Sequence, residues 1–146
     1  MNTSPSLSHP AVRWHMPVVL AFASVCFAAM WVFFAGATGS TLSWLAVLAA
    51  MDLAWFIRKL GWPYKDSRPV VTMLFTAATI ALANYWMASV LYSLQHNPNI
   101  LQALSHVGDP QILFKIRLMN TVTDWFWYAM ALFIASMLAS RPNRAT

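Results

Sequence analysis

Glutamate is absent from this chain, and the whole sequence holds only four acidic residues against nine lysines and arginines. Charged residues make up 9% of the chain, whereas soluble domains average about 25%. Hydrophobic residues make up 60%, and the mean hydropathy is +0.57. This balance excludes an ordinary soluble domain and indicates an integral membrane protein.

Cysteine and glycine are also scarce. The single cysteine, Cys26, excludes an intramolecular disulfide and dithiol chemistry. Four scattered glycines provide no glycine-rich loop that could hold a phosphate, so we expect no nucleotide cofactor and no other cofactor. His96, His106 and Asp109 lie near one another in sequence, but the gap between the histidines fits no standard metal-site spacing. We therefore expect no metal site.

Long apolar runs dominate the sequence. A membrane-spanning helix needs about 20 predominantly apolar residues, and four runs approach or exceed that length. They cover approximately residues 17–37, 41–58, 69–94 and 111–139. The sequence therefore predicts an all-α, polytopic membrane protein. We expect residues 1–146 to form a single integral membrane domain, built as a four-transmembrane-helix bundle.

The connection after the third predicted span carries a helical pattern of its own. Asn97 and Pro98 resemble the start of a helix, and Gly108 resembles its end. The apolar residues between them share one face. We predict a short amphipathic helix over residues 98–107, lying on the membrane surface in the outer loop.

The basic residues predict the orientation of the chain. Seven of the nine lie on one side of the four predicted spans, and the positive-inside rule makes that side cytoplasmic. These seven are Arg13, Arg58, Lys59, Lys65, Arg68, Arg141 and Arg144. We therefore expect a multi-pass protein of a bacterial-type inner (plasma) membrane, with both termini cytoplasmic. Lys115 and Arg117 are the exceptions, and snorkelling to the outer headgroups explains them most simply. Because the basic patches follow this topology, we expect no nucleic-acid partner.

Two aspartates, Asp52 and Asp124, lie inside the apolar runs. An ionised carboxylate there costs roughly 2.5–3.5 kcal/mol on insertion scales, so such residues are rare and usually have a partner. In one continuous fourth helix, Arg117, Asn120 and Asp124 would share a face, and we predict a polar network of these three. Asn84 lies deep in the third span and is the remaining candidate. Whether Asp124 is ionised depends on whether Arg117 or the nearby aromatic rings lie closest to it.

Small and aromatic residues predict how the helices pack. Ala46, Ala50 and Ala54 form a line on the face of the second span opposite Asp52, and such lines let helices approach closely. We expect the deep tryptophans to fill the bundle interior rather than to line a lipid or quinone pocket. These are Trp55, Trp86, Trp125 and Trp127.

Several functions are open to a protein of this kind. The soluble segments are too small to hold an active site, which favours a non-enzymatic protein that docks onto another membrane protein. An accessory subunit, an assembly factor or an immunity-type inhibitor would act in this way, with the buried polar residues orienting the helices. The alternative is a small oligomeric proton- or cation-coupled transporter or channel that uses Asp52 and Asp124. A two-aspartate membrane hydrolase is a minor alternative. The expected partners are the lipid bilayer and either another membrane protein or a second copy.

Overall fold

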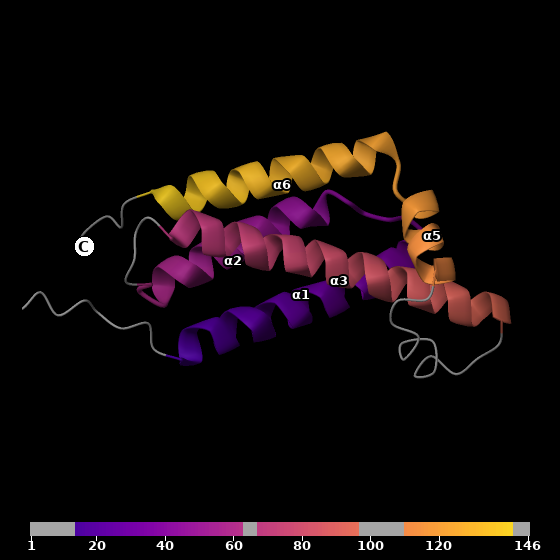
Figure 1. Cartoon of the computed structure of the whole chain (residues 1–146), viewed down its shortest axis with the longest axis horizontal. Coiled ribbons are helices and arrows are strands. Elements are labelled where there is room, and N and C mark those ends of the chain that lie inside the picture. The colour runs from indigo at the N-terminus through magenta and orange to yellow at the C-terminus, as the bar shows by residue number, and fades with distance from the viewer. Residues whose placement is uncertain (1–13, 63–66, 97–109, 142–146) are drawn as a thin grey trace, which may run out of the picture.

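Four helices run along a common direction, and a shorter one lies across one end of them (Figure 1). The computed structural model describes residues 14–62, 67–96 and 110–141. The helices are α1 (His15–Thr38), α2 (Leu45–Lys59), α3 (Arg68–His96), α5 (Pro110–Met119) and α6 (Val122–Ser140). α1, α2, α3 and α6 alternate in direction, so α1 begins and α6 ends at the same end of the bundle. The described residues thus form an all-helical bundle, as predicted.

Three helices, not four, are long and apolar enough to cross a membrane: α1, α3 and α6. At 1.5 Å per residue, α1 measures about 36 Å and α6 about 28 Å, comparable with a hydrocarbon core of about 30 Å. The region predicted as a span over residues 41–58 is not one helix of spanning length, because α2 begins only at Leu45 and its 15 residues reach about 22 Å. A non-helical connection, residues 39–44, runs back along the bundle before α2 begins (Figure 1). Three apolar helices are compatible with a multi-pass membrane protein.

The predicted fourth span, residues 111–139, is two helices rather than one. α5 ends at Met119, and α6 starts at Val122 in a different direction (Figure 1). Thr121 has an extended backbone, with φ −84° and ψ 170°, and forms a capping box with Asp124. A capping box satisfies N–H groups that a helix start leaves free, so a new helix is stable from this point. The amphipathic helix predicted over residues 98–107 lies outside the described residues.

The core consists largely of small residues on facing helices. α2 packs most extensively against α6, and α3 contacts α1, α2, α5 and α6. Two alanine lines are at most 1% exposed: Ala46, Ala50 and Ala54 on α2, and Ala131, Ala135 and Ala139 on α6. Such small side chains let helix backbones approach closely. The packing line predicted for the second apolar run is therefore confirmed.

The tryptophans do not all take the interior positions that we expected. Trp55 is 54% exposed and Trp125 is 61% exposed, so both lie on the outer surface. The close contact between α2 and α6 explains this, because an indole ring would not fit between the alanine lines. Trp31 is instead the largest fully buried side chain. The outer surface of the bundle is therefore apolar and partly aromatic.

We predict that Ala50→Leu will destabilise the bundle by about 1–3 kcal/mol, because a larger side chain would overpack the contact between α2 and α6. The matched control is Leu48→Phe, since Leu48 is 42% exposed on the same helix. It should change stability by no more than about 0.5 kcal/mol. Tryptophan fluorescence during reversible SDS unfolding in mixed micelles would measure both. Equal effects of the two substitutions would contradict close packing of α2 on α6.

Candidate functional site

Four hydrogen-bond donors converge on the buried carboxylate of Asp124. Thr121 donates to Oδ2 from its backbone N–H at 2.7 Å and from its hydroxyl at 2.8 Å. Thr41, in the connection between α1 and α2, donates to Oδ1 at 3.3 Å, and the hydroxyl of Ser43 donates to the same oxygen. No described residue forms an ion pair with this carboxylate. Its charge is balanced instead by hydroxyls, a backbone N–H and the first turn of α6, where the helix dipole favours an anion.

A closed ring of three hydrogen bonds lies one helical turn further along α6. Asn84 donates from Nδ2 to the Tyr128 hydroxyl at 3.1 Å, and that hydroxyl donates to Asn120 Oδ1 at 2.7 Å. Asn120 donates back from Nδ2 to Asn84 Oδ1 at 2.9 Å. Each amide also donates to a carbonyl of its own helix, that of Ile80 or that of Ile116. The ring therefore joins α3, the junction between α5 and α6, and α6 itself.

These two clusters leave little hydrogen-bonding capacity for a substrate or an ion. Both amides and the phenol of the ring already donate and accept within the chain. Both oxygens of the Asp124 carboxylate also accept donors from the chain. Interhelical hydrogen bonds in membranes contribute only about 0.6 kcal/mol each on average, yet they select one arrangement of the helices. The geometry therefore favours orientation of the helices as the role of these residues.

The residues predicted as one polar network are separated. Because the helix is interrupted between α5 and α6, Asn120 bonds to α3, whereas Asp124 bonds to the connection between α1 and α2. Arg117 is exposed on α5 and forms no ion pair with Asp124 in the described part of the chain. The predicted face of Arg117, Asn120 and Asp124 thus does not exist, although the structure does bring Asn120 to Asn84.

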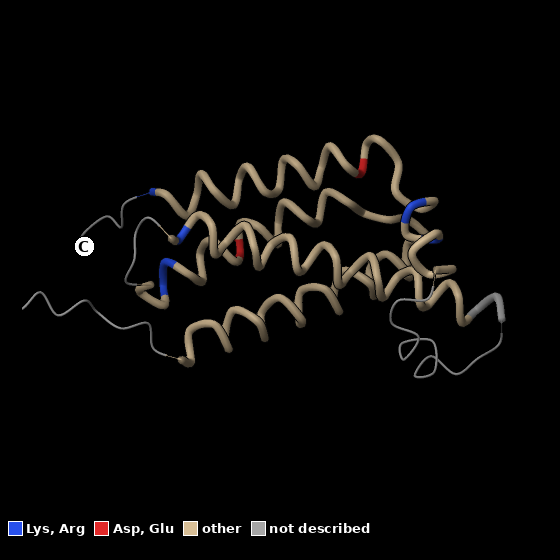
Figure 2. The backbone as a smooth tube through the Cα atoms, viewed as in Figure 1, with Lys and Arg blue, Asp and Glu red and all other residues tan. Residues whose placement is uncertain are grey.

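Asp52 differs from the other polar candidates. Within the described ranges, no group donates a hydrogen bond to its carboxylate or forms an ion pair with it. It lies midway along α2 and is partly exposed, in an open groove between α1 and α2, and this groove is the candidate functional site. Lys59, two turns further along α2, places its Nζ 5.8 Å from the centre of the Trp55 ring. Figure 2 shows the two aspartates, in red, at different levels along the bundle.

The lining of this groove is apolar apart from Asp52. α1 contributes Val19, Phe22, Ala23, Cys26, Phe27 and Met30, and α2 contributes Leu48, Met51, Trp55 and Phe56. Of all the helix pairs in contact, α1 and α2 touch each other least, which leaves the groove open to the outside. An unpaired carboxylate therefore faces surroundings that offer it no hydrogen bond.

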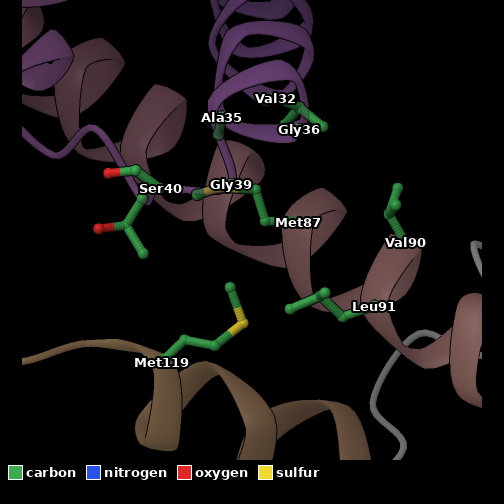
Figure 3. A pocket seen from close by; sticks show the side chains of 10 residues that line it. Val32, Ala35, Gly36, Gly39, Ser40, Met87, Val90, Leu91 and Met119 are labelled. Carbon is green, nitrogen blue, oxygen red and sulfur yellow. The ribbon is translucent and has the colours of Figure 1, made fainter.

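A separate cavity lies at the end of the bundle near α5. It measures about 340 Å³ and is bounded by α1, the connection before α2, α3 and the last residue of α5. Met87 from α3 and Met119 from α5 extend into it (Figure 3). None of its lining residues is charged, so it suits a hydrocarbon group better than a polar substrate.

Metal-ligating residues do not gather within the described ranges. No three His, Cys, Asp or Glu side chains there could hold one ion together. Cys26 is a free, exposed thiol in the same groove as Asp52.

Thr41 and Ser43 were not predicted as partners of Asp124, whereas Trp127 or Tyr128 was expected on the face of the fourth predicted span that carries Asn120 and Asp124. The threonine-x-x-aspartate pattern at residues 121–124 is a helix-start signal and could have shown that α6 begins there. No sequence signal points to the bonds from Thr41 and Ser43, because those residues lie 83 and 81 positions from Asp124.

We predict that Asp124→Ala will destabilise the protein by about 2 kcal/mol or more. It would leave hydroxyl and N–H donors without an acceptor and would remove the Asp124 half of the capping box at the start of α6. Asp52→Asn should change stability by no more than about 0.5 kcal/mol, because Asp52 has no partner to lose. SDS unfolding of both variants provides the test. A destabilisation by Asp52→Asn as large as that by Asp124→Ala would contradict this assignment.

We also predict that Tyr128→Phe will cost about 1 kcal/mol, because it breaks two of the three hydrogen bonds of the ring. Phe133→Leu, at a residue of α6 that is 60% exposed, is the control. The same unfolding assay measures both variants. A Tyr128→Phe variant as stable as the control would show that the ring contributes nothing to the bundle.

Comparison with known proteins identifies no relative. No protein-family model matches the chain, and neither the curated proteins nor the solved structures contain a significant match. Its function must therefore be inferred from its own residues and their geometry.

Proposed function

We propose that this protein is a non-enzymatic, multi-pass membrane protein that works by docking onto another membrane protein. The docking surface is the outward side of α1 and α2, with the Asp52 groove at its centre. One observation carries this proposal: Asp52 lies midway along an apolar groove and has no partner among the described residues. Lipid chains can cover the apolar lining but cannot satisfy a carboxylate, whereas another protein can do both.

The charge distribution supports an orientation in the membrane. Among the described basic residues, four lie at the end where α1 begins, and two lie at the opposite end (Figure 2). The four are Arg58, Lys59, Arg68 and Arg141, and the two are Lys115 and Arg117. By the positive-inside rule, the first end is cytoplasmic, as in a bacterial-type inner membrane. Both termini then lie on the cytoplasmic side.

The fourth pass of the bundle is made by α2 together with the connection that precedes it. α2 is too short to span alone, but its inner face is fully covered by α6 and α3. Part of the non-helical connection is anchored to the bundle, because the Thr41 carbonyl accepts from Trp31 Nε1 and the hydroxyls of Thr41 and Ser43 donate to Asp124. This arrangement supports a four-pass topology in which α2 carries the docking surface.

A conduit through Asp52 and Asp124 is supported less well. A proton relay needs groups linked by hydrogen bonds or water, and these two aspartates lie at different levels along the bundle (Figure 2). Asp124 is also held by donors of the chain itself. The docking function is consistent with both aspartates, because Asp124 is bonded within the chain and Asp52 is left without a partner among the described residues.

We predict that a photoreactive amino acid at Met51, beside Asp52, will crosslink to one other membrane protein in native membranes. The same probe at Phe133 on α6 should not give that product, and Asp52→Leu should reduce the Met51 product about fivefold or more. Such a loss corresponds to about 1 kcal/mol of interaction.

Two results would contradict the docking function. One is a set of crosslinks that is identical from Met51 and from Phe133. The other is proton or cation flux through the purified protein in liposomes that disappears in Asp52→Asn. That second result would favour the conduit.

A further inference from the structure

We infer that the occupant of the Asp52 groove is a transmembrane helix of a different protein that carries a lysine or arginine near the middle of its span. This inference rests on the proposed docking function and names the chemistry of the partner. It follows from the charge of Asp52, the position of that residue along α2, and the distribution of basic residues in the chain.

The Asp52 carboxylate has no hydrogen-bond donor among the described residues, and the residues around it are apolar. All ten other residues that line the groove carry apolar side chains or a thiol. A carboxylate in such a site reaches a low free energy when an opposite charge binds it and excludes lipid. A basic residue on a neighbouring span is itself costly in hydrocarbon. A contact between the two side chains therefore removes both the carboxylate and the cation from lipid. Charge complementarity therefore favours a cationic partner over an apolar one.

α2 itself does not supply a cation that pairs with the Asp52 carboxylate. Lys59 is the nearest basic residue further along the exposed face of α2, seven residues from Asp52, or about 10 Å along the axis. Its ammonium group lies over the Trp55 ring, which is placed between the two charges in sequence. The Lys59 ammonium is therefore engaged by the Trp55 ring, and within the described residues it forms no ion pair with Asp52.

A second copy of this chain is a poor occupant of the groove, because its basic residues lie in the wrong places. The nine lysines and arginines occupy positions 13, 58, 59, 65, 68, 115, 117, 141 and 144. None falls within residues 14–57, 69–114 or 118–140, so α1, α2, α3 and α6 of a second copy offer no cation along their middle. In a dimer with twofold symmetry about this groove, Asp52 would meet another Asp52, and like charges repel. A different protein fits the groove better.

The depth of Asp52 specifies where the partner carries its charge. If Lys59 marks the cytoplasmic headgroup level, Asp52 lies about 10 Å inside it and about 5 Å from the middle of a 30 Å hydrocarbon core. A basic residue within a turn or so of the centre of a span can reach this position. A basic residue at the end of a span cannot.

The test uses synthetic transmembrane peptides as probes. Four polyleucine peptides of about 23 residues carry lysine, glutamine, glutamate or leucine at the central position, long enough to span. Energy transfer from a donor on the purified full-length protein to an acceptor on each peptide, in phosphatidylcholine vesicles, measures association. The lysine peptide should bind about fivefold more tightly than the leucine peptide, an affinity ratio typical of one interhelical polar contact. Asp52→Leu should abolish this preference, and Phe133→Leu should preserve it.

Three results would overturn the inference. Equal binding of the lysine and leucine peptides would show that Asp52 does not select a cation. Equal binding of the lysine and glutamine peptides would show that any hydrogen-bonding residue suffices. Asp52-dependent energy transfer between two labelled copies would identify a second copy as the occupant.

The peptide assay tests the cationic partner, and the crosslinking assay tests the docking function, so a negative result in one can be distinguished from a negative result in the other. A specific crosslink from Met51, combined with no preference for the lysine peptide, would leave the docking function standing and refute the cationic partner. Absence of the crosslink as well would refute the docking function itself.

Discussion

The hydrogen bonds on Asp124 fix the start of α6 to the connection between α1 and α2, and the rest of the bundle depends on this contact. That connection is non-helical, so its polar groups need partners inside the protein. Asp124 accepts from Thr41 and Ser43, and the Thr41 carbonyl accepts a 2.9 Å hydrogen bond from Trp31 Nε1. Leu42, between them, has a φ of +46°, which is strained for a leucine. The hydrogen bonds of Thr41 and Ser43, on either side of Leu42, stabilise this strained conformation and fix the position at which α2 begins.

Asp52 and Asp124 show how identical residues take different structural roles in different surroundings. Both are followed three residues later by a tryptophan, in aspartate-x-x-tryptophan patterns. Asp124 begins a helix and receives donors from a distant part of the chain, so its charge is bound within the fold. Asp52 lies within a helix whose buried face consists of alanines, leucines and an isoleucine, and its side chain lines the open groove on another face. One aspartate is therefore bound within the fold, and the other has no partner among the described residues.

The sequence predicts those features that depend on residues close together along the chain. Apolar length located α1 and α3, and alanine spacing located the packed face of α2. Hydrophobicity alone could not place the start of α2, because residues 41–44 are uncharged and continue directly into the apolar residues of that helix. The interruption at Thr121 had a local signal, the capping box, that the apolar run obscured. The partners of Asp124 and the lack of a partner for Asp52 depend on how helices distant in sequence pack, and local patterns do not report this packing.

The unequal lengths of the helices have a consequence for the surrounding lipid. α3, with 29 residues, measures about 43 Å, whereas α2 measures about 22 Å. In a bilayer, the hydrocarbon thickness presented beside α2 would therefore be smaller than the average, and lipids in contact with α2 would thin or tilt to match it. This mismatch has a small cost per ångström. A neighbouring protein with a short span would relieve it, so bilayer thickness and the charge of Asp52 would select the same kind of companion.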